Sequence, residues 1–168
     1  MKTLAQAFRS LLLNDGWYVL HIQKQLNQPC TVCSTLEPNS HCKTCLGSGF
    51  RVQLSPILTR SSSATRPDYT EQDETPVGII GSQSMLYYTL PENSVNEGDM
   101  ILSVSWSVPT DQVPRQGQVV AVHKVFEANR VDAKLGERGE LAYYRVSTHD
   151  MDVDLKWMAR CLVQSRPI

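Results

Sequence analysis

The chain has 168 residues, of which 41 % are apolar and 20 % are charged, and its formal net charge at pH 7 is −1. This apolar content is sufficient for one domain of ordinary size, with or without a small appendage. Without an excess of positive charge, nucleic-acid binding through bulk electrostatics is disfavoured. No apolar run is long enough to span a bilayer or act as a secretory signal, so we expect a soluble protein made in a reducing cytosol.

The N-terminal part of the chain predicts a helix followed by a strand. Residues 3–14 place apolar side chains at helical spacing, and Asn14 with Gly16 marks the end of the helix. The next run, Trp17–Gln23, is rich in aromatic and branched residues, which is typical of a strand. A cysteine-rich module then occupies about residues 29–49.

The rest of the chain predicts strands, interrupted by one long polar loop. Residues 50–54 alternate apolar and polar side chains and predict a half-buried strand. Residues 55–76 hold few apolar side chains and predict a mobile loop, either a disordered linker or a segment that orders against a partner. Further strands are predicted at residues 85–90, 102–108, 118–126, 141–147 and, from an odd-numbered apolar series, 151–163.

Several short strands at this spacing predict a mainly β fold, a small barrel or sandwich with a short N-terminal helix and an inserted four-cysteine zinc knuckle. The sequence divides into four segments. Residues 1–28 hold the helix and first strand, 29–50 the metal knuckle, 51–76 a strand and flexible loop, and 77–168 a barrel-like domain.

Two matched cysteine pairs are the strongest chemical signal. Each pair has C-x-x-C spacing, which lets two thiolates bind one metal ion from a single tight turn. Eight residues separate the pairs, so both can close on one ion in a tetrahedral site. The glycines at 47 and 49 suit the positive φ angles of a chain that wraps around sulfur atoms. The predicted ligands are Cys30, Cys33, Cys42 and Cys45.

We expect the bound ion to be a structural zinc. Four thiolates fill the tetrahedron and leave no open position for a substrate, and the metal supplies folding energy to a loop without a core of its own. Iron in a rubredoxin-like arrangement is compatible with the same ligands. The alternatives are reduced, buried thiols or two disulfides. His41, beside the second pair, is expected to be an exposed neighbour rather than a ligand.

Other polar and thiol groups carry weaker signals. Cys161 falls on the apolar phase of the last predicted strand and is interpreted as a buried free thiol. Asp150, Asp152 and Asp154 are interpreted as the solvent-facing phase of that strand, because Leu155 stands where a calcium loop needs glycine. No nucleophile elbow, phosphate-binding loop or H-E-x-x-H helix is present, so we expect a protein that is not an enzyme. The histidines are scattered, at positions 21, 41, 123 and 149.

Two resemblances to known families follow from these motifs. The segment Cys42–Gly49 is similar to the C-x-x-C-x-G-x-G repeat of DnaJ-type chaperones, a match of eight residues. The first cysteine pair lacks the following glycines, and the His-Pro-Asp of a J-domain is absent from the sequence.

The wider layout resembles small virion proteins of tailed bacteriophages, especially those of the neck and head-to-tail junction. The shared features are a short helix, a strand, the paired cysteines and a β-rich remainder. The stretch Val113–Val122 is also similar to the P-x-x-G-D-x-V turn of β-barrel connector proteins, with Gln118 in place of the aspartate. The resemblance covers roughly residues 5–54 and 98–146.

This resemblance implies a non-enzymatic, ring-forming neck connector of the adaptor or stopper type that joins head and tail. It implies the four cysteines as metal ligands, a ring-shaped homo-oligomer, portal, neck or tail subunits as partners, and the virion as location, after assembly in the host cytoplasm. Neither a membrane nor a specific nucleic-acid sequence is expected as a partner. The alternatives are a tail or baseplate component, or a zinc-ribbon module that binds nucleic acid or protein.

Overall fold

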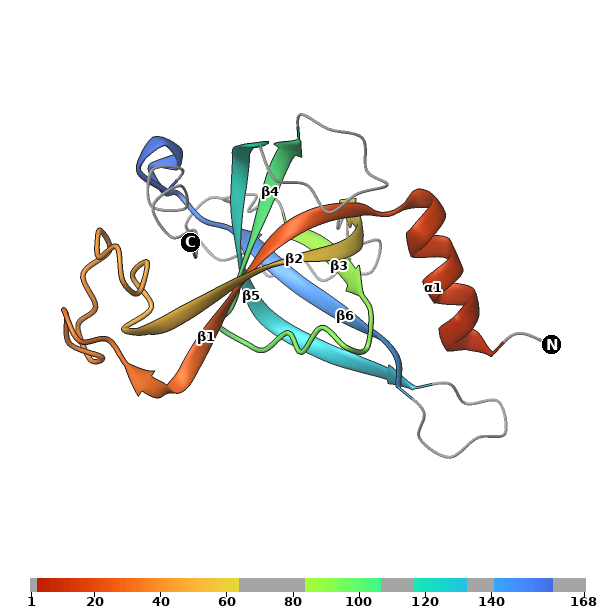
Figure 1. Cartoon of the computed structure of the whole chain (residues 1–168), viewed down its shortest axis with the longest axis horizontal. Helices are drawn as coiled ribbons and strands as arrows, with labels where there is room; N and C mark the ends of the chain where they lie inside the picture. Colours follow the sequence, from red (N-terminus) through yellow and green to blue (C-terminus); the bar gives the residue numbers. More distant parts are fainter. Residues whose placement is uncertain (1–2, 64–83, 107–116, 133–140, 159–168) are drawn as a thin grey trace, which may run out of the picture.

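A computed structural model describes residues 3–63, 84–106, 117–132 and 141–158. The described residues form one helix of twelve residues and six strands (Figure 1). The elements are α1 (Leu4–Asp15), β1 (Trp17–Pro29), β2 (Phe50–Ser63), β3 (Ser84–Thr89), β4 (Met100–Trp106), β5 (Gly117–Asp132) and β6 (Leu141–Asp150). The mainly β class predicted from the sequence is confirmed, and so is the short N-terminal helix.

Helix α1 begins and ends where local sequence signals place it. The Thr3 side chain accepts a hydrogen bond from the Gln6 backbone N–H, and the Gln6 side chain accepts one from the Thr3 N–H, which forms a capping box. At the other end the Gly16 N–H donates to the Leu12 carbonyl oxygen. Leu12 is fully buried and anchors the helix.

The six strands close into a barrel with the order β1-β2-β3-β6-β5-β4. Every neighbouring pair is antiparallel. Closure comes from a short pairing of β1 with β4, in which Leu20, His21 and Ile22 face Leu102, Ile101 and Met100. Since each strand has two neighbours, the described sheet has no free edge, and an edge is the usual site of strand-mediated association.

The barrel interior contains one buried apolar residue from each strand. These residues belong to one cluster: Val19, Ile57, Tyr87, Ile101, Val125 and Val146. Because side chains alternate between the two faces of a strand, the neighbours of these residues point outward. The interior packing therefore follows the period of two that the sequence shows.

A second apolar cluster lies on the outer face of β1, β2, β4 and β5. Residues 151–158 cover this face with Met151, Val153, Leu155, Trp157 and Met158. The predicted strand at 151–163 is wrong for these residues: after β6 ends at Asp150 the chain is irregular, and residues 155–158 are helical. The Asp154 carboxylate caps this helical turn by accepting from the Lys156 and Trp157 backbone N–H groups. The alternating apolar residues of 151–158 therefore indicate burial against the barrel, not pairing as a strand.

The polar loop predicted at 55–76 is also wrong in its first part, because β2 continues to Ser63. Residues 55–59 pair with β1, and residues 59–63 pair with β3. Ile57 and Thr59 are buried in the barrel, so neighbouring strands on both sides hold a segment whose composition is polar. Residues 64–76 lie outside the described residues.

The barrel extends beyond the segment 77–168, because β1 and β2, which lie earlier in the chain, pair within it. Cys161, the predicted strand residues 159–163 and the first part of the stretch Val113–Val122 lie outside the described residues. In the described part of the chain, no helix has the length and apolar character required to cross a membrane.

Candidate metal centre

The cysteine knuckle is the connection between β1 and β2, which pair continuously from Trp17 to Lys24. Its two ends are joined, since the Cys30 N–H donates to the Gly49 carbonyl oxygen at 2.9 Å. The register shifts between Lys24 and Pro29, just before the first cysteine. The knuckle therefore replaces an ordinary hairpin turn and stands on a paired base.

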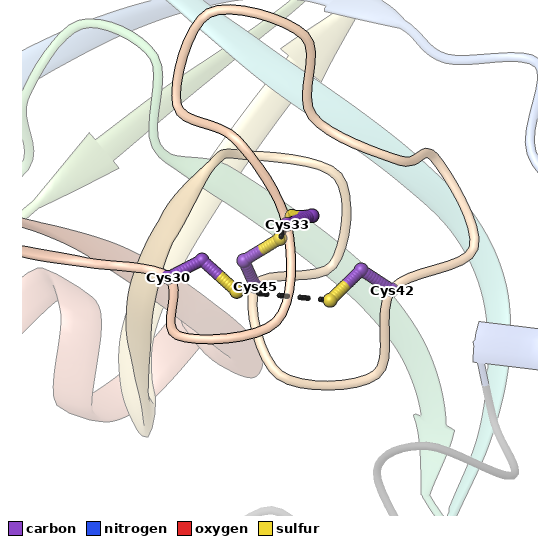
Figure 2. Close-up of side chains that lie close together, drawn as sticks. All are labelled: Cys30, Cys33, Cys42 and Cys45. Carbon is purple, nitrogen blue, oxygen red and sulfur yellow. Dashed lines mark hydrogen bonds between the residues drawn. The ribbon is translucent and has the colours of Figure 1, made fainter.

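The four predicted ligands converge in space. Their sulfur atoms all lie within 4.8 Å of one another, and Figure 2 shows the side chains turned toward a common centre. The Cys30 and Cys42 sulfurs are 3.8 Å apart, and those of Cys33 and Cys45 are 3.3 Å apart. A zinc tetrahedron with Zn–S bonds of about 2.3 Å has sulfur–sulfur edges of about 3.8 Å. The observed spacing fits that geometry.

The same distances argue against the disulfide alternative. A disulfide requires a sulfur–sulfur distance of about 2.05 Å, and all four cysteines are free. Three of them are buried, and Cys33 is half-buried. Four polar sulfurs gathered in one buried cluster are better explained by a shared cation than by apolar packing alone.

The surrounding backbone favours thiolate at one ligand. The Val32 N–H donates to the Cys30 sulfur at 3.4 Å, and this bond is the largest cause that lowers the pKa of Cys30 to about 7. Burial instead raises the pKa of Cys45 to about 12. A thiol this deeply buried ionises only when a positive charge stabilises the thiolate, and a divalent cation would supply that charge.

The loop after the second pair wraps around the sulfurs in a left-handed conformation. Leu46, Gly47 and Gly49 have φ angles of 50°, 81° and 76°, which confirms the predicted role of the two glycines. A Cβ atom on Gly49 would lie 3.0 Å from the Thr35 Cα atom, so the chain has no room for a side chain there.

The knuckle packs on the barrel rather than standing apart from it. Leu46 is buried in the outer cluster, and the His41 ring meets the Trp157 ring edge to face at 5.4 Å. His41 Nδ1 lies 3.1 Å from the Ser40 hydroxyl. As predicted, His41 is exposed, and it is not among the residues that converge on the sulfur cluster.

The identity of the metal is inferred from the donor set. Four sulfur donors are the ligands of structural zinc and of rubredoxin-type iron, and they fit either ion. In both cases the coordination is complete. The site can fix a loop, but it offers no position at which a substrate would bind.

A row of polar side chains in contact with one another crosses the barrel interior. It was not predicted from the sequence. Ser103 Oγ lies 3.0 Å from the Tyr87 hydroxyl and 3.3 Å from His123 Nε2. His123 Nδ1 lies 2.7 Å from the Asp150 carboxylate, and this contact is an ion pair only when the imidazole is protonated. Burial lowers the pKa of His123 below 6.5, and Asp150 partly opposes this shift.

A second buried pair ties a turn to β1. Asp99 accepts hydrogen bonds from the Lys24 and Asn96 backbone N–H groups, and it pairs with His21 Nε2 at 2.9 Å. His21 and Asp99 are 78 positions apart in the sequence. Nothing in the local sequence signals either pairing, because only barrel closure brings these residues together.

No protein-family model matches the chain, and no curated protein matches it. The site is therefore interpreted from its own geometry.

Proposed function

We propose that this chain is a structural virion protein of a tailed bacteriophage: a ring-forming neck connector of the adaptor or stopper type that joins head and tail. The observation that carries the proposal is the cysteine knuckle itself, held at one end of a closed barrel and exposing apolar side chains. Leu36 is 91 % exposed, and Val32 is 70 % exposed. Apolar side chains on a rigid projection are suited to burial against another subunit.

The closed barrel supports an assembly role that uses side chains rather than strand addition. Its described strands are all paired on both sides, so neighbouring subunits would meet through loops, the knuckle and α1. A heterologous contact repeated around an axis closes a ring, which is the symmetry of a portal or a tail tube. The partners in this proposal are portal, neck or tail subunits of the virion and further copies of the chain.

The proposed cofactor is one structural zinc ion held by Cys30, Cys33, Cys42 and Cys45. Metal analysis of the purified chain by inductively coupled plasma mass spectrometry distinguishes the ions. Zinc at about one ion per chain is expected. Iron would give a coloured protein, and it would change the metal without changing the proposed structural role.

The function is tested by mixing the full chain with the portal and tail proteins of a tailed phage whose genome encodes the chain. Negative-stain electron microscopy and native mass spectrometry should find rings of this chain bound to one of those partners. A chain that remains monomeric and absent from virions contradicts the proposal. Immunogold labelling of virions separates a neck protein from a tail or baseplate component.

The row of polar side chains in the barrel favours one alternative function, that of a serine hydrolase. His123 contacts Ser103 through Nε2 and Asp150 through Nδ1, as the histidine of a catalytic triad does. We propose a structural role for them, because Ser103 Oγ also contacts the hydroxyl of the fully buried Tyr87. A fluorophosphonate probe should leave Ser103 unlabelled; labelling that His123→Gln abolishes would favour the hydrolase.

The other rival is a zinc-ribbon module that binds nucleic acid. Its binding would weaken steeply with salt, whereas a connector should show little affinity at any salt concentration. Residues 1–50 hold four basic and two acidic side chains, an excess of only two positive charges. This small excess favours the connector.

A further inference from the structure

The knuckle and α1 lie at opposite ends of the long axis of the molecule (Figure 1), and each contributes to an exposed apolar surface. One is the knuckle tip, which we define as residues 32–37. Its leucine, Leu36, projects almost fully into solvent. The Leu36 N–H donates to the Ser34 hydroxyl at 3.1 Å, so a local turn fixes the backbone from which Leu36 projects.

The other surface is concave and lies between α1 and the barrel wall. This groove, which we call the α1 groove, has a volume of about 550 Å³ and is lined mainly by Leu4, Phe8, Leu11, Arg60, Tyr88 and Tyr143. Its aromatic walls are fixed by stacking, since the Phe8 and Tyr143 ring centroids lie 4.5 Å apart. Leu4 and Leu11 remain 43 % and 37 % exposed. The apolar stripe of α1 is thus wider than the part of the helix that packs on the barrel.

The charges of the two surfaces are complementary. Arg60 lies in the wall of the groove, with its side chain 47 % exposed. Its ion pair with Asp15 is long, at 4.0 Å, and solvent reaches both groups, so this pairing is weak. On the knuckle tip, the exposed Glu37 directly follows Leu36. A leucine followed by a carboxylate matches an apolar groove with a guanidinium in its wall.

We propose that the knuckle tip of one copy docks in the α1 groove of a second copy, with Leu36 in the groove and Glu37 paired with Arg60. The occupant is this same chain, because it presents both the projecting and the receiving surface. The two surfaces differ, so the contact is heterologous and repeats from copy to copy until a ring closes. This inference rests on the proposed ring-forming function and names its contact.

A charge exchange tests the contact. Association of the full, metal-loaded chain is measured by analytical ultracentrifugation. Glu37→Arg and Arg60→Glu are each expected to weaken association by at least about tenfold, since each places like charges together. The double variant E37R/R60E should recover most of that loss. Two single variants that associate like wild type, or a double variant with no recovery, would overturn the pairing.

Matched leucine substitutions test the apolar part. Leu36→Asp should weaken association by at least about tenfold, because it places a charge in the groove. Leu13→Asp is the control: Leu13 is a leucine of α1 that is 69 % exposed but does not line the groove. Metal content and circular dichroism verify that each variant is folded. Equal association of Leu36→Asp and Leu13→Asp would contradict the proposal.

The outcomes separate this inference from the function on which it rests. A wild-type ring that tolerates all of these substitutions contradicts the knuckle-to-groove contact and leaves the connector function standing. A wild-type chain that stays monomeric, alone and with virion partners, contradicts both. Rings that each single charge variant dissolves and the double variant restores support both.

Discussion

At the scale of single residues, Asp99 contributes more to the stability of the fold than its position in a turn indicates. It is 1 % exposed and is bonded to His21 and to two backbone N–H groups. Asp99→Ala leaves these buried groups without partners and should lower the free energy of unfolding by about 3–5 kcal/mol. Urea denaturation measures the change. Asp132→Ala, at an exposed ion pair, is the control and should cost less than about 0.5 kcal/mol.

His123 predicts how stability depends on pH. Its pKa in the folded chain is lowered by burial. At pH values between that pKa and 6.5, the imidazole is therefore protonated more in the unfolded chain than in the folded chain. The neutral, buried His123 imidazole therefore makes its full contribution to stability above pH 6.5, and this contribution is lost as the pH falls through the lowered pKa. NMR should show the His123 imidazole titrating below 6.5, and His123→Gln should flatten this part of the stability profile. A titration above 6.5 would show that Asp150, rather than burial, dominates.

At the scale of elements, the knuckle should depend on all four cysteines. Cys45→Ser replaces a fully buried side chain of the predicted ligand set, so the bound metal should fall well below one ion per chain. Metal analysis after exhaustive dialysis measures this loss. Lys43→Ala, at an exposed position between the ligands of the second pair, should keep its metal. A Cys45→Ser chain with full metal content would show that the sulfurs are not the ligands.

Elements with local signals could be predicted from the sequence, and those that depend on closure could not. The helix follows from its spacing and its end at Gly16, and the knuckle follows from two C-x-x-C pairs. The extension of β2 to Ser63 could not be predicted, because strands distant in sequence hold it. The helical turn at 155–158 was missed because its alternating apolar residues resemble a strand. The Asp154 cap was the available signal for that turn.

At the scale of the whole molecule, the metal should affect the barrel surface as well as the knuckle. Leu46 joins the knuckle to residues 151–158 in the outer cluster. Removing the metal with a chelator should therefore speed amide hydrogen exchange at residues 30–49 and also at 155–158, while β3 and β6 stay protected. Mass spectrometry of the exchanged peptides measures the pattern. Faster exchange throughout the barrel would mean that the barrel does not fold without the metal.

The position of the knuckle between β1 and β2 also bears on how quickly the barrel forms. These strands pair over most of the length of β1, but a loop of about twenty residues must close before they meet, and its closure costs chain entropy. A metal bound early would shorten that loop and bring the two strands into register first. The sulfur cluster would then act as a folding nucleus, and the metal-free chain would refold more slowly even where its final barrel is the same.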